Sequence, residues 1–145
     1  MRAEIKWLEA MKFVAESGTG HCVVLDTPDS GKGASPMEML LLGMGGCTAV
    51  DVVSILQKAR QPLRDCTVLV EAEREEEYPR TFKSIHLHYT LIGNGLSEPQ
   101  VQRAIQLSQE KYCAASIMMG RSGAEVSHTY EILPDPSQGG GEGPA

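Results

Sequence analysis

The sequence predicts an α+β fold in which antiparallel sheets surround two long buried central helices, in the order βββα-ββ-αβ. Three observations lead to this prediction. Short stretches near the N-terminus alternate apolar and polar side chains, which is typical of strands. Residues 37–60 are apolar almost all round, and residues 97–119 carry apolar side chains at helical spacing. Three more alternating stretches precede and follow this second helix.

The N-terminal part is expected to form three strands. Residues 3–8 alternate with their large apolar side chains on one face, and residues 11–16 alternate more weakly. The run 21–26 (HCVVLD) is rich in β-branched residues and follows the turn sequence Ser-Gly-Thr-Gly. Because these stretches are short and separated by turns, we expect a three-stranded antiparallel meander, followed by a loop at 27–35 (TPDSGKGAS).

The first helix is predicted over Met37–Arg60, ending near Pro62. Ser35 can cap it, Pro36 suits the first helical position, and Glu38 completes a Ser-x-x-Glu capping box. Its middle contains three glycines, Gly43, Gly45 and Gly46. Each glycine costs about 1 kcal/mol of helix propensity relative to alanine. Such a cluster therefore indicates that another part of the backbone approaches the helix closely.

The second half of the chain continues with strands at Thr67–Glu73 and Thr81–Ile92. A helix follows over Ser97–Met119, where Gln100 completes a second capping pattern, and residues 124–132 alternate again as a last strand. We expect one domain over residues 1–133. The Pro- and Gly-rich residues 134–145 (PDPSQGGGEGPA) are expected to be a flexible tail.

Composition excludes several classes of function. The 145 residues carry a net charge of −6, with a sequence pI near 5.2, so no basic face is expected that would bind nucleic acid. The N-terminus lacks the apolar core of a signal peptide. No uninterrupted apolar run reaches the roughly 18–20 residues of a membrane span. We therefore expect a cytoplasmic protein without membrane or nucleic-acid partners.

The chain contains four cysteines, Cys22, Cys47, Cys66 and Cys113, without a CxxC pair. No structural zinc site or other cofactor is expected from this spacing. Cys22 and Cys66 lie in or beside strands and are expected to be packing residues. Cys47 lies in an apolar helix, where burial disfavours the ionised thiol, so it is either inert packing or a reactive thiol with a cation or hydrogen-bond donor close by.

Other polar residues invite functional interpretations. His86 and His88 lie on one face of a strand, but two ligands do not make a metal site, and a polar strand face is the better explanation of them. Glu110 lies one helical turn before Cys113, where it either orients a guanidinium or keeps the helix surface in water. Gly31-Lys32-Gly33 lacks the surroundings of a phosphate-binding loop.

Several motifs together resemble the OsmC/Ohr superfamily. They are Ser35-Pro36-Met37-Glu38-Met39-Leu40, the run Gly45–Leu56 (GGCTAVDVVSIL), Pro79-Arg80-Thr81-Phe82 and Glu110-Lys111-Tyr112-Cys113. The similarity spans nearly the whole chain except the tail. The run GGC-x-A-x-DVVSILQK is most similar to the YhfA-like branch of this superfamily.

The resemblance implies a homodimer with an intertwined α+β fold and active sites at the dimer interface. In peroxidase members, a cysteine matching Cys47 attacks an organic hydroperoxide and becomes a sulfenic acid. A cysteine matching Cys113 then forms a disulfide with it, which a dithiol reductant reopens. The resemblance thus implies an organic hydroperoxide as substrate, with an apolar pocket for its alkyl part at Met37, Leu41 and Met44.

The sequence departs from the peroxidase pattern at two positions. Peroxidase members carry a Glu directly after the helix-opening proline, where this chain has Met37, and Glu38 is rotated by about 100° from that position. They also supply an Arg before the helix, whereas no Arg lies between Trp7 and Pro36. Arg80 is the candidate replacement, since a guanidinium is always charged and can hold a thiolate and a peroxide oxygen together.

These observations leave three hypotheses. The first is an enzyme, a cysteine-based peroxidase for organic hydroperoxides that serves the oxidative-stress response, with Cys47 peroxidatic and Cys113 resolving. Arg80 is its activating cation and Glu110 the orienter of that cation. The second is a thiol sensor, or a dimer that binds a small apolar ligand and has lost the peroxidase electrostatics. The third, weaker hypothesis is a metal-binding protein that uses His86 and His88.

Overall fold

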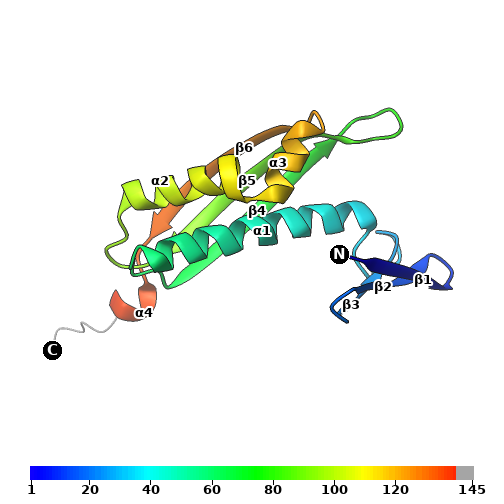
Figure 1. Cartoon of the computed structure of the whole chain (residues 1–145), viewed down its shortest axis with the longest axis horizontal. Helices are drawn as coiled ribbons and strands as arrows, with labels where there is room; N and C mark the ends of the chain where they lie inside the picture. The colour runs from blue at the N-terminus through cyan, green and yellow to red at the C-terminus, as the bar shows by residue number, and fades with distance from the viewer. Residues whose placement is uncertain (140–145) are drawn as a thin grey trace. The chain divides into compact units, whose positions relative to one another are not determined.

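The computed structural model describes residues 1–139, which fall into two compact units with the boundary between Leu42 and Gly43 (Figure 1). The boundary between these units lies inside the first helix. Each unit is described separately below. Our expectation of one domain over residues 1–133 stays a prediction.

The first unit contains an antiparallel sheet with strand order β1-β2-β3. The strands are β1 (Ala3–Glu9), β2 (Lys12–Ser17) and β3 (Cys22–Leu25), which confirms the predicted meander. Trp7 is paired with Phe13, which is paired on its other side with Leu25. This small sheet does not bury its own large apolar side chains, because Trp7 remains 63% exposed.

Helix α1 (Pro36–Lys58) begins and ends close to the predicted bounds. The Ser35 hydroxyl accepts the Glu38 backbone N–H at 3.2 Å, so the predicted cap is present, and it donates to the Glu38 carboxylate at 3.1 Å. By length and composition alone, α1 is long and apolar enough to cross a membrane. Within the second unit it is a core helix instead, and the buried residues of α1 are Met44, Gly45, Thr48, Val52 and Leu56.

Packing within the chain accounts for one of the three glycines. A Cβ atom at Gly45 would lie 3.0 Å from Cγ2 of Val70, so this position of α1 requires the smallest side chain. Cβ atoms at Gly43 and Gly46 would meet nothing within 4 Å among the described residues. The close approach predicted from the glycine cluster is therefore found at Gly45.

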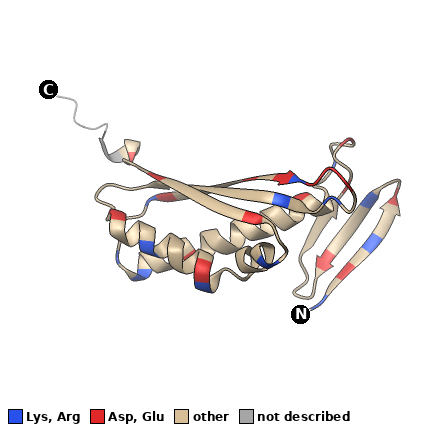
Figure 2. Cartoon of the chain, turned by 90° about the horizontal axis from the view of Figure 1, so that it is seen from above, with Lys and Arg blue, Asp and Glu red and all other residues tan. Residues whose placement is uncertain are grey.

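The second sheet has strand order β4-β5-β6. Its strands are β4 (Asp65–Arg74), β5 (Phe82–Ile92) and β6 (Glu125–Leu133). Strands β4 and β5 are antiparallel, but β5 and β6 are parallel, which corrects our expectation of purely antiparallel sheets. The physical reason is the helical crossover between them, which returns the chain to the same end of the sheet. Figure 2 shows the helices on one face of this sheet.

The predicted second helix is interrupted. It consists of α2 (Glu98–Leu107), a π-helical turn η1 (Ser108–Tyr112) and α3 (Ala114–Arg121). Ser97 caps α2 by accepting the Gln100 N–H, as predicted. A continuous helix over Ser97–Met119 is wrong, because Cys113 adopts an extended conformation (φ −80°, ψ 94°) and caps α3. Cys113 therefore lies at a helix junction rather than inside a helix.

The first residues of the segment expected to be a flexible tail are bonded to the rest of the second unit. Asp135 is buried and forms an ion pair with Arg64 at 3.5 Å, while its backbone N–H donates to Asn94 at 3.0 Å. A short helix α4 (Pro136–Gly139) follows. The start of the predicted tail is therefore anchored, and residues 140–145 lie outside the described residues.

The contact between Gly45 and Val70 generates a stability prediction. Gly45→Val is expected to lower the free energy of unfolding by about 1–3 kcal/mol, because the larger side chain overpacks this contact. Val70→Ala makes room, so the double variant is expected to lose less than the sum of the two single variants. Urea unfolding at one fixed protein concentration measures all three.

Gly120→Val is the matched control for this prediction. It also places valine on a helix, but its Cβ meets nothing within 4 Å among the described residues. Strictly additive losses for Gly45→Val and Val70→Ala would contradict the overpacking explanation.

Candidate functional site

The fold brings Cys47 and Cys113 together from separate elements. Cys47 is partly buried in the middle of α1, and Cys113 is fully buried at the junction between η1 and α3. Burial is the main cause that raises the pKa of the Cys113 thiol, and a side-chain hydrogen bond with Cys47 raises it further. The two thiols therefore lie near enough for Cys47 to affect the pKa of Cys113. Both cysteines are free thiols.

Ser116 opposes the effect of burial on Cys113. Its backbone N–H donates to the Cys113 sulfur at 3.4 Å, which makes Cys113 the N-cap of α3. Hydrogen bonds from the Ser116 side chain and backbone both lower the pKa of the Cys113 thiol. Burial is the larger effect, so this pKa lies above its ordinary value.

A buried set of polar side chains lies directly beside the two thiols. The Thr48 hydroxyl forms hydrogen bonds of 2.7 Å with the hydroxyls of Tyr89 and Ser108, and all three side chains are fully buried. The Ser108 hydroxyl donates to the Asp51 carboxylate at 2.9 Å. These bonds connect α1, β5 and η1 at the position next to Cys47.

Gln109 extends this network toward Cys113. Its amide nitrogen lies 2.8 Å from the Tyr89 hydroxyl, 3.1 Å from the Ser116 hydroxyl and 3.2 Å from the Thr48 hydroxyl. Burial is the main cause that raises the pKa of Tyr89, while hydrogen bonds from Thr48 and Gln109 lower it. Each buried side-chain nitrogen and oxygen of the described residues has a hydrogen-bond partner. The network is therefore complete within one chain.

Sequence reasoning missed this network, although one signal was present. Thr48 and Ser108 are polar residues at apolar-face positions of their helices, and a buried hydroxyl needs a partner. The π-helical turn was not predicted. It is the turn from which the consecutive residues Ser108 and Gln109 both reach the network.

Arg80 lies in the exposed loop between β4 and β5. Its Nε donates to the Glu75 carbonyl at 3.3 Å, and its backbone N–H donates to the Glu77 carbonyl at 2.8 Å. Among the described residues of this chain, no hydrogen bond or ion pair joins the Arg80 guanidinium to either thiol. The role of Arg80 as the activating cation stays a prediction.

Glu110 lies on η1 and is exposed. Its two carboxylate oxygens accept from the Gln106 amide at 3.4 and 3.5 Å. Within the described part of this chain, Glu110 has no ion pair with Arg80. Its role as orienter of the cation also stays a prediction, and the observed bond corresponds to the simpler interpretation as a helix surface residue.

The three residues of the expected substrate pocket share one face of α1. Met44 is fully buried, whereas Met37 and Leu41 are partly buried. Glu38 is bonded to Ser35 in the capping box, as its position in the sequence suggested. The pocket itself stays a prediction.

His86 and His88 point to one face of β5, as predicted, and both are bonded to β6. The His86 ring nitrogens lie 2.7 Å from the Ser127 hydroxyl and 2.9 Å from the Thr129 hydroxyl. His88 bonds to Thr129 at 2.7 Å and to Glu131 at 3.2 Å. Residues 1–139 contain no group of three or more side chains suited to hold a metal ion. The geometry thus favours a polar strand face over a metal site.

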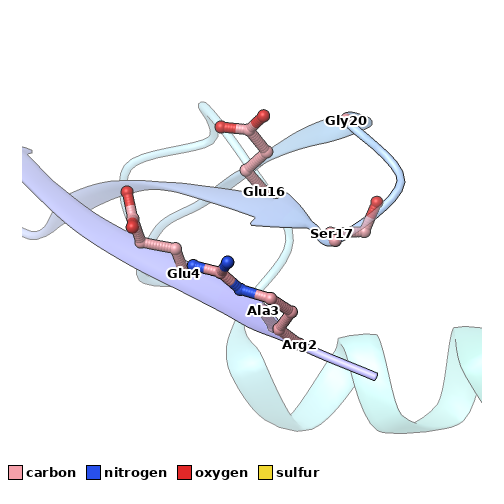
Figure 3. A pocket seen from close by; sticks show the side chains of 7 residues that line it. Arg2, Ala3, Glu4, Glu16, Ser17 and Gly20 are labelled. Carbon is pink, nitrogen blue, oxygen red and sulfur yellow. The ribbon is translucent and has the colours of Figure 1, made fainter.

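A cavity of about 290 Å³ lies at one end of the β1–β2 hairpin (Figure 3). One guanidinium and two carboxylates line it, from Arg2, Glu4 and Glu16. No thiol is among the residues that line it. The pair of cysteines is therefore the stronger candidate site.

Three comparisons place the chain among known proteins. The profile of the family described as "OsmC-like protein" matches residues 29–129. Protein YhfA of Escherichia coli K12 is 45% identical over 133 residues, which are 92% of this chain and 98% of that protein. A hypothetical protein of Aquifex aeolicus VF5 has a solved structure with a TM-score of 0.78 and 28% identity, and the match covers 90% of this chain and 96% of the other.

A more distant structure shares the fold alone. It is the organic hydroperoxide resistance protein OsmC of Legionella pneumophila, with a TM-score of 0.65 and 17% identity over 92% of this chain and 96% of the other. The architecture described above matches the fold of these proteins. On the family profile and the identity to YhfA, this chain belongs to the OsmC-like family.

Proposed function

We propose that this protein reduces organic hydroperoxides with Cys47 as the attacking thiol and Cys113 as the resolving thiol. The observation that carries the proposal is that these two free thiols, from separate elements of the fold, lie near enough for Cys47 to raise the pKa of Cys113. The OsmC-like family includes proteins linked by name to organic hydroperoxide resistance, which supports the same activity here.

The proposed reaction has two steps within the protein. The Cys47 thiolate attacks the terminal oxygen of the hydroperoxide, the O–O bond breaks, and the alkoxide leaves as an alcohol after taking a proton. Cys47 is then a sulfenic acid. The Cys113 thiolate attacks its sulfur and displaces hydroxide, which leaves as water, and a disulfide remains. A dithiol reductant reopens this disulfide and is itself oxidised.

We propose the cytoplasm as the compartment of this protein, because the reaction needs free thiols and a supply of reductant, which the cytosol maintains.

We further propose that the active protein is a homodimer, because one chain leaves apolar surfaces without a partner. The first unit leaves Ile5 and Trp7 more than half exposed. On α1, Val50 is 69% exposed and shares a face with Gly43 and Gly46. Open glycines beside an exposed apolar side chain suit the close approach of a second helix. A second copy of this chain is the occupant that we propose.

In this dimer, Arg80 is proposed to act on Cys47 of the other protomer. The proposal is supported by the position of Arg80 in an exposed loop, where its guanidinium bonds only a backbone carbonyl among the described residues. A thiolate needs a nearby positive charge or donor to form at neutral pH. An arginine supplied by the second protomer meets this need.

A second candidate function is a thiol sensor that also forms the Cys47–Cys113 disulfide but reacts slowly. One observation favours this sensor: within the described residues of one chain, no cation is bonded to either thiol. The two functions differ in rate. Rapid and stoichiometric consumption of hydroperoxide excludes the sensor.

The proposed peroxidase mechanism predicts a fast reaction with cumene hydroperoxide. In stopped-flow measurements the reduced protein is expected to consume one equivalent of peroxide, and Cys47→Ser is expected to lose at least about a hundredfold in rate, because the nucleophile is absent. Cys113→Ser is expected to keep the first step and to accumulate the Cys47 sulfenic acid. Cys22→Ser is the control with an unchanged rate.

A rate for Cys47→Ser equal to that of the unmodified protein would show that the mechanism is wrong. Slow oxidation of the unmodified protein by every peroxide tested, with the disulfide still formed, would instead support the sensor.

Mixed dimers test the proposed action of Arg80. Arg80→Ala and Cys47→Ser are each expected to be inactive as homodimers. In a mixed dimer, the Cys47 of the Arg80→Ala chain meets the intact Arg80 of the Cys47→Ser chain, so one of the two sites is restored. We expect about half of the peroxidase activity per dimer in peroxide-consumption assays.

The matched control is a mixed dimer of one Arg74→Ala chain and one Cys47→Ser chain, because Arg74 lies at the other side of the same loop. An inactive mixed dimer of Arg80→Ala and Cys47→Ser would place the guanidinium in the same protomer as its thiol. Activity of the Arg80→Ala homodimer would remove Arg80 from the mechanism altogether.

A further inference from the structure

We propose that a cavity between α1 and the stretch formed by α2 and η1 binds a small organic monocarboxylate. The carboxylate lies at the basic end of this cavity, and the apolar body of the ligand lies along its middle. The cavity has a volume of about 560 Å³, and the residues that line it all belong to the second unit. The inference does not depend on the proposed peroxidase function, because it concerns binding alone.

Two hydrogen bonds fix the course of the two helices beside this cavity. The Ser97 N–H, at the start of α2, donates to the Gln61 side chain at 2.8 Å, just after the end of α1. The Ser108 hydroxyl, at the start of η1, donates to Asp51 of α1 at 2.9 Å. Helices α1 and α2 therefore run in opposite directions (Figure 1), and the cavity lies along the stretch that these bonds connect.

One end of the cavity is basic. Lys58 lies in the last turn of α1 and Arg103 in the middle of α2, and both line the cavity. Because the helices are antiparallel, Arg103 lies toward the end of α1 that carries Lys58. Among the described residues, no ion pair joins either side chain to a carboxylate, although the chain has a net charge of −6. Both cations are therefore available to an anion from solution.

Apolar side chains line the middle of the cavity. Ile55 contributes from α1, Leu107 from α2 and Tyr112 from η1. Tyr112 is 53% exposed, and the Lys111 ammonium, which is not among the lining groups, lies 5.3 Å from the centroid of its ring. Ligand sites typically combine apolar walls with a few charged groups that orient the ligand. An alkyl or aryl body suits these walls, with its charged head at the basic end.

The other end of the cavity is acidic. Asp51 and Lys58 are seven residues apart, which is nearly two turns, so they share one side of α1 about 10 Å apart along its axis. The Asp51 carboxylate disfavours a second anionic group at its end of the cavity. The ligand that fits is therefore a monocarboxylate rather than a dicarboxylate.

The cavity and the proposed dimer contact use different sides of α1. Asp51 follows Val50 by one residue, which rotates its side chain by about 100° around the helix. Val50 belongs to the open side of α1, whereas Asp51 and Lys58 face the cavity beside α2. A second copy on the open side therefore leaves the assignment of this cavity unchanged.

The test is a ¹H–¹⁵N NMR titration of the reduced, full-length protein with three ligands of equal chain length. Heptanoate is expected to give saturable shifts that are largest at the backbone amides of Ile55 and Leu107. 1-Heptanol is expected to bind at least about tenfold more weakly, because it lacks the charge-assisted bonds to the two cations. Heptanedioate is expected to bind roughly fivefold more weakly than heptanoate, because its second carboxylate approaches Asp51.

Variants assign the two ends of the cavity. Arg103→Gln and Lys58→Gln are each expected to weaken heptanoate binding about tenfold, and both positions are exposed, so the fold is expected to be retained. Arg121→Gln, which removes an exposed arginine outside the cavity, is the matched control with unchanged affinity. Asp51→Asn keeps an oxygen acceptor for Ser108 and is expected to raise the affinity for heptanedioate to that for heptanoate.

Equal affinities for heptanoate and 1-heptanol would overturn the proposed site, and so would unchanged heptanoate binding in both Arg103→Gln and Lys58→Gln. Shifts that do not saturate, or that spread over the exposed apolar surface, would also overturn it. Heptanedioate binding as tight as that of heptanoate would contradict the assigned orientation and with it the preference for a monocarboxylate. Failure of Cys47 to react with hydroperoxide contradicts the proposed function only, because these titrations contain no peroxide.

Discussion

The hydrogen bond between Thr48 and Tyr89 joins α1 to the second sheet in a region that solvent does not reach. Loss of either hydroxyl removes one hydrogen bond from a buried polar group, which costs about 0.5–1.5 kcal/mol. Two side chains of η1 bond to the same pair, so a helix, a strand and the π-helical turn share one set of bonds. Cys47 precedes Thr48 and Cys113 follows η1, so the placement of both thiols depends on this bond.

The site combines two requirements that oppose each other. In the proposed reaction a resolving thiol has to lie close to its partner, and Cys113 is fully buried. Burial disfavours the thiolate that has to attack. The break in the second helix resolves part of this conflict, because it leaves the Ser116 backbone N–H free to donate to the Cys113 sulfur at 3.4 Å. A continuous helix would have used that N–H within its own backbone.

The sequence predicted the elements well and the site only in part. Alternation and the capping residues Ser35 and Ser97 placed the strands and the helix starts, because these signals are local. The parallel pairing of β6, the junction at Cys113 and the bonds of Gln109 depend on residues far apart in the chain. Periodicity carries no information about such pairings, and the resemblance to a family supplied the cysteine pair instead.

The remaining constraint concerns apolar surface. The side of α1 that carries Thr48 packs on the second sheet, and the side that carries Val50 and the open Gly46 does not pack within the second unit. A helix that is apolar all round is stable in water only when both sides are covered. The second copy of the chain in our proposal covers the open side and brings a further surface close to Cys47, which neighbours Gly46. In this proposal, self-association and completion of the thiol site both depend on the same helix, because the open Gly46 directly precedes Cys47.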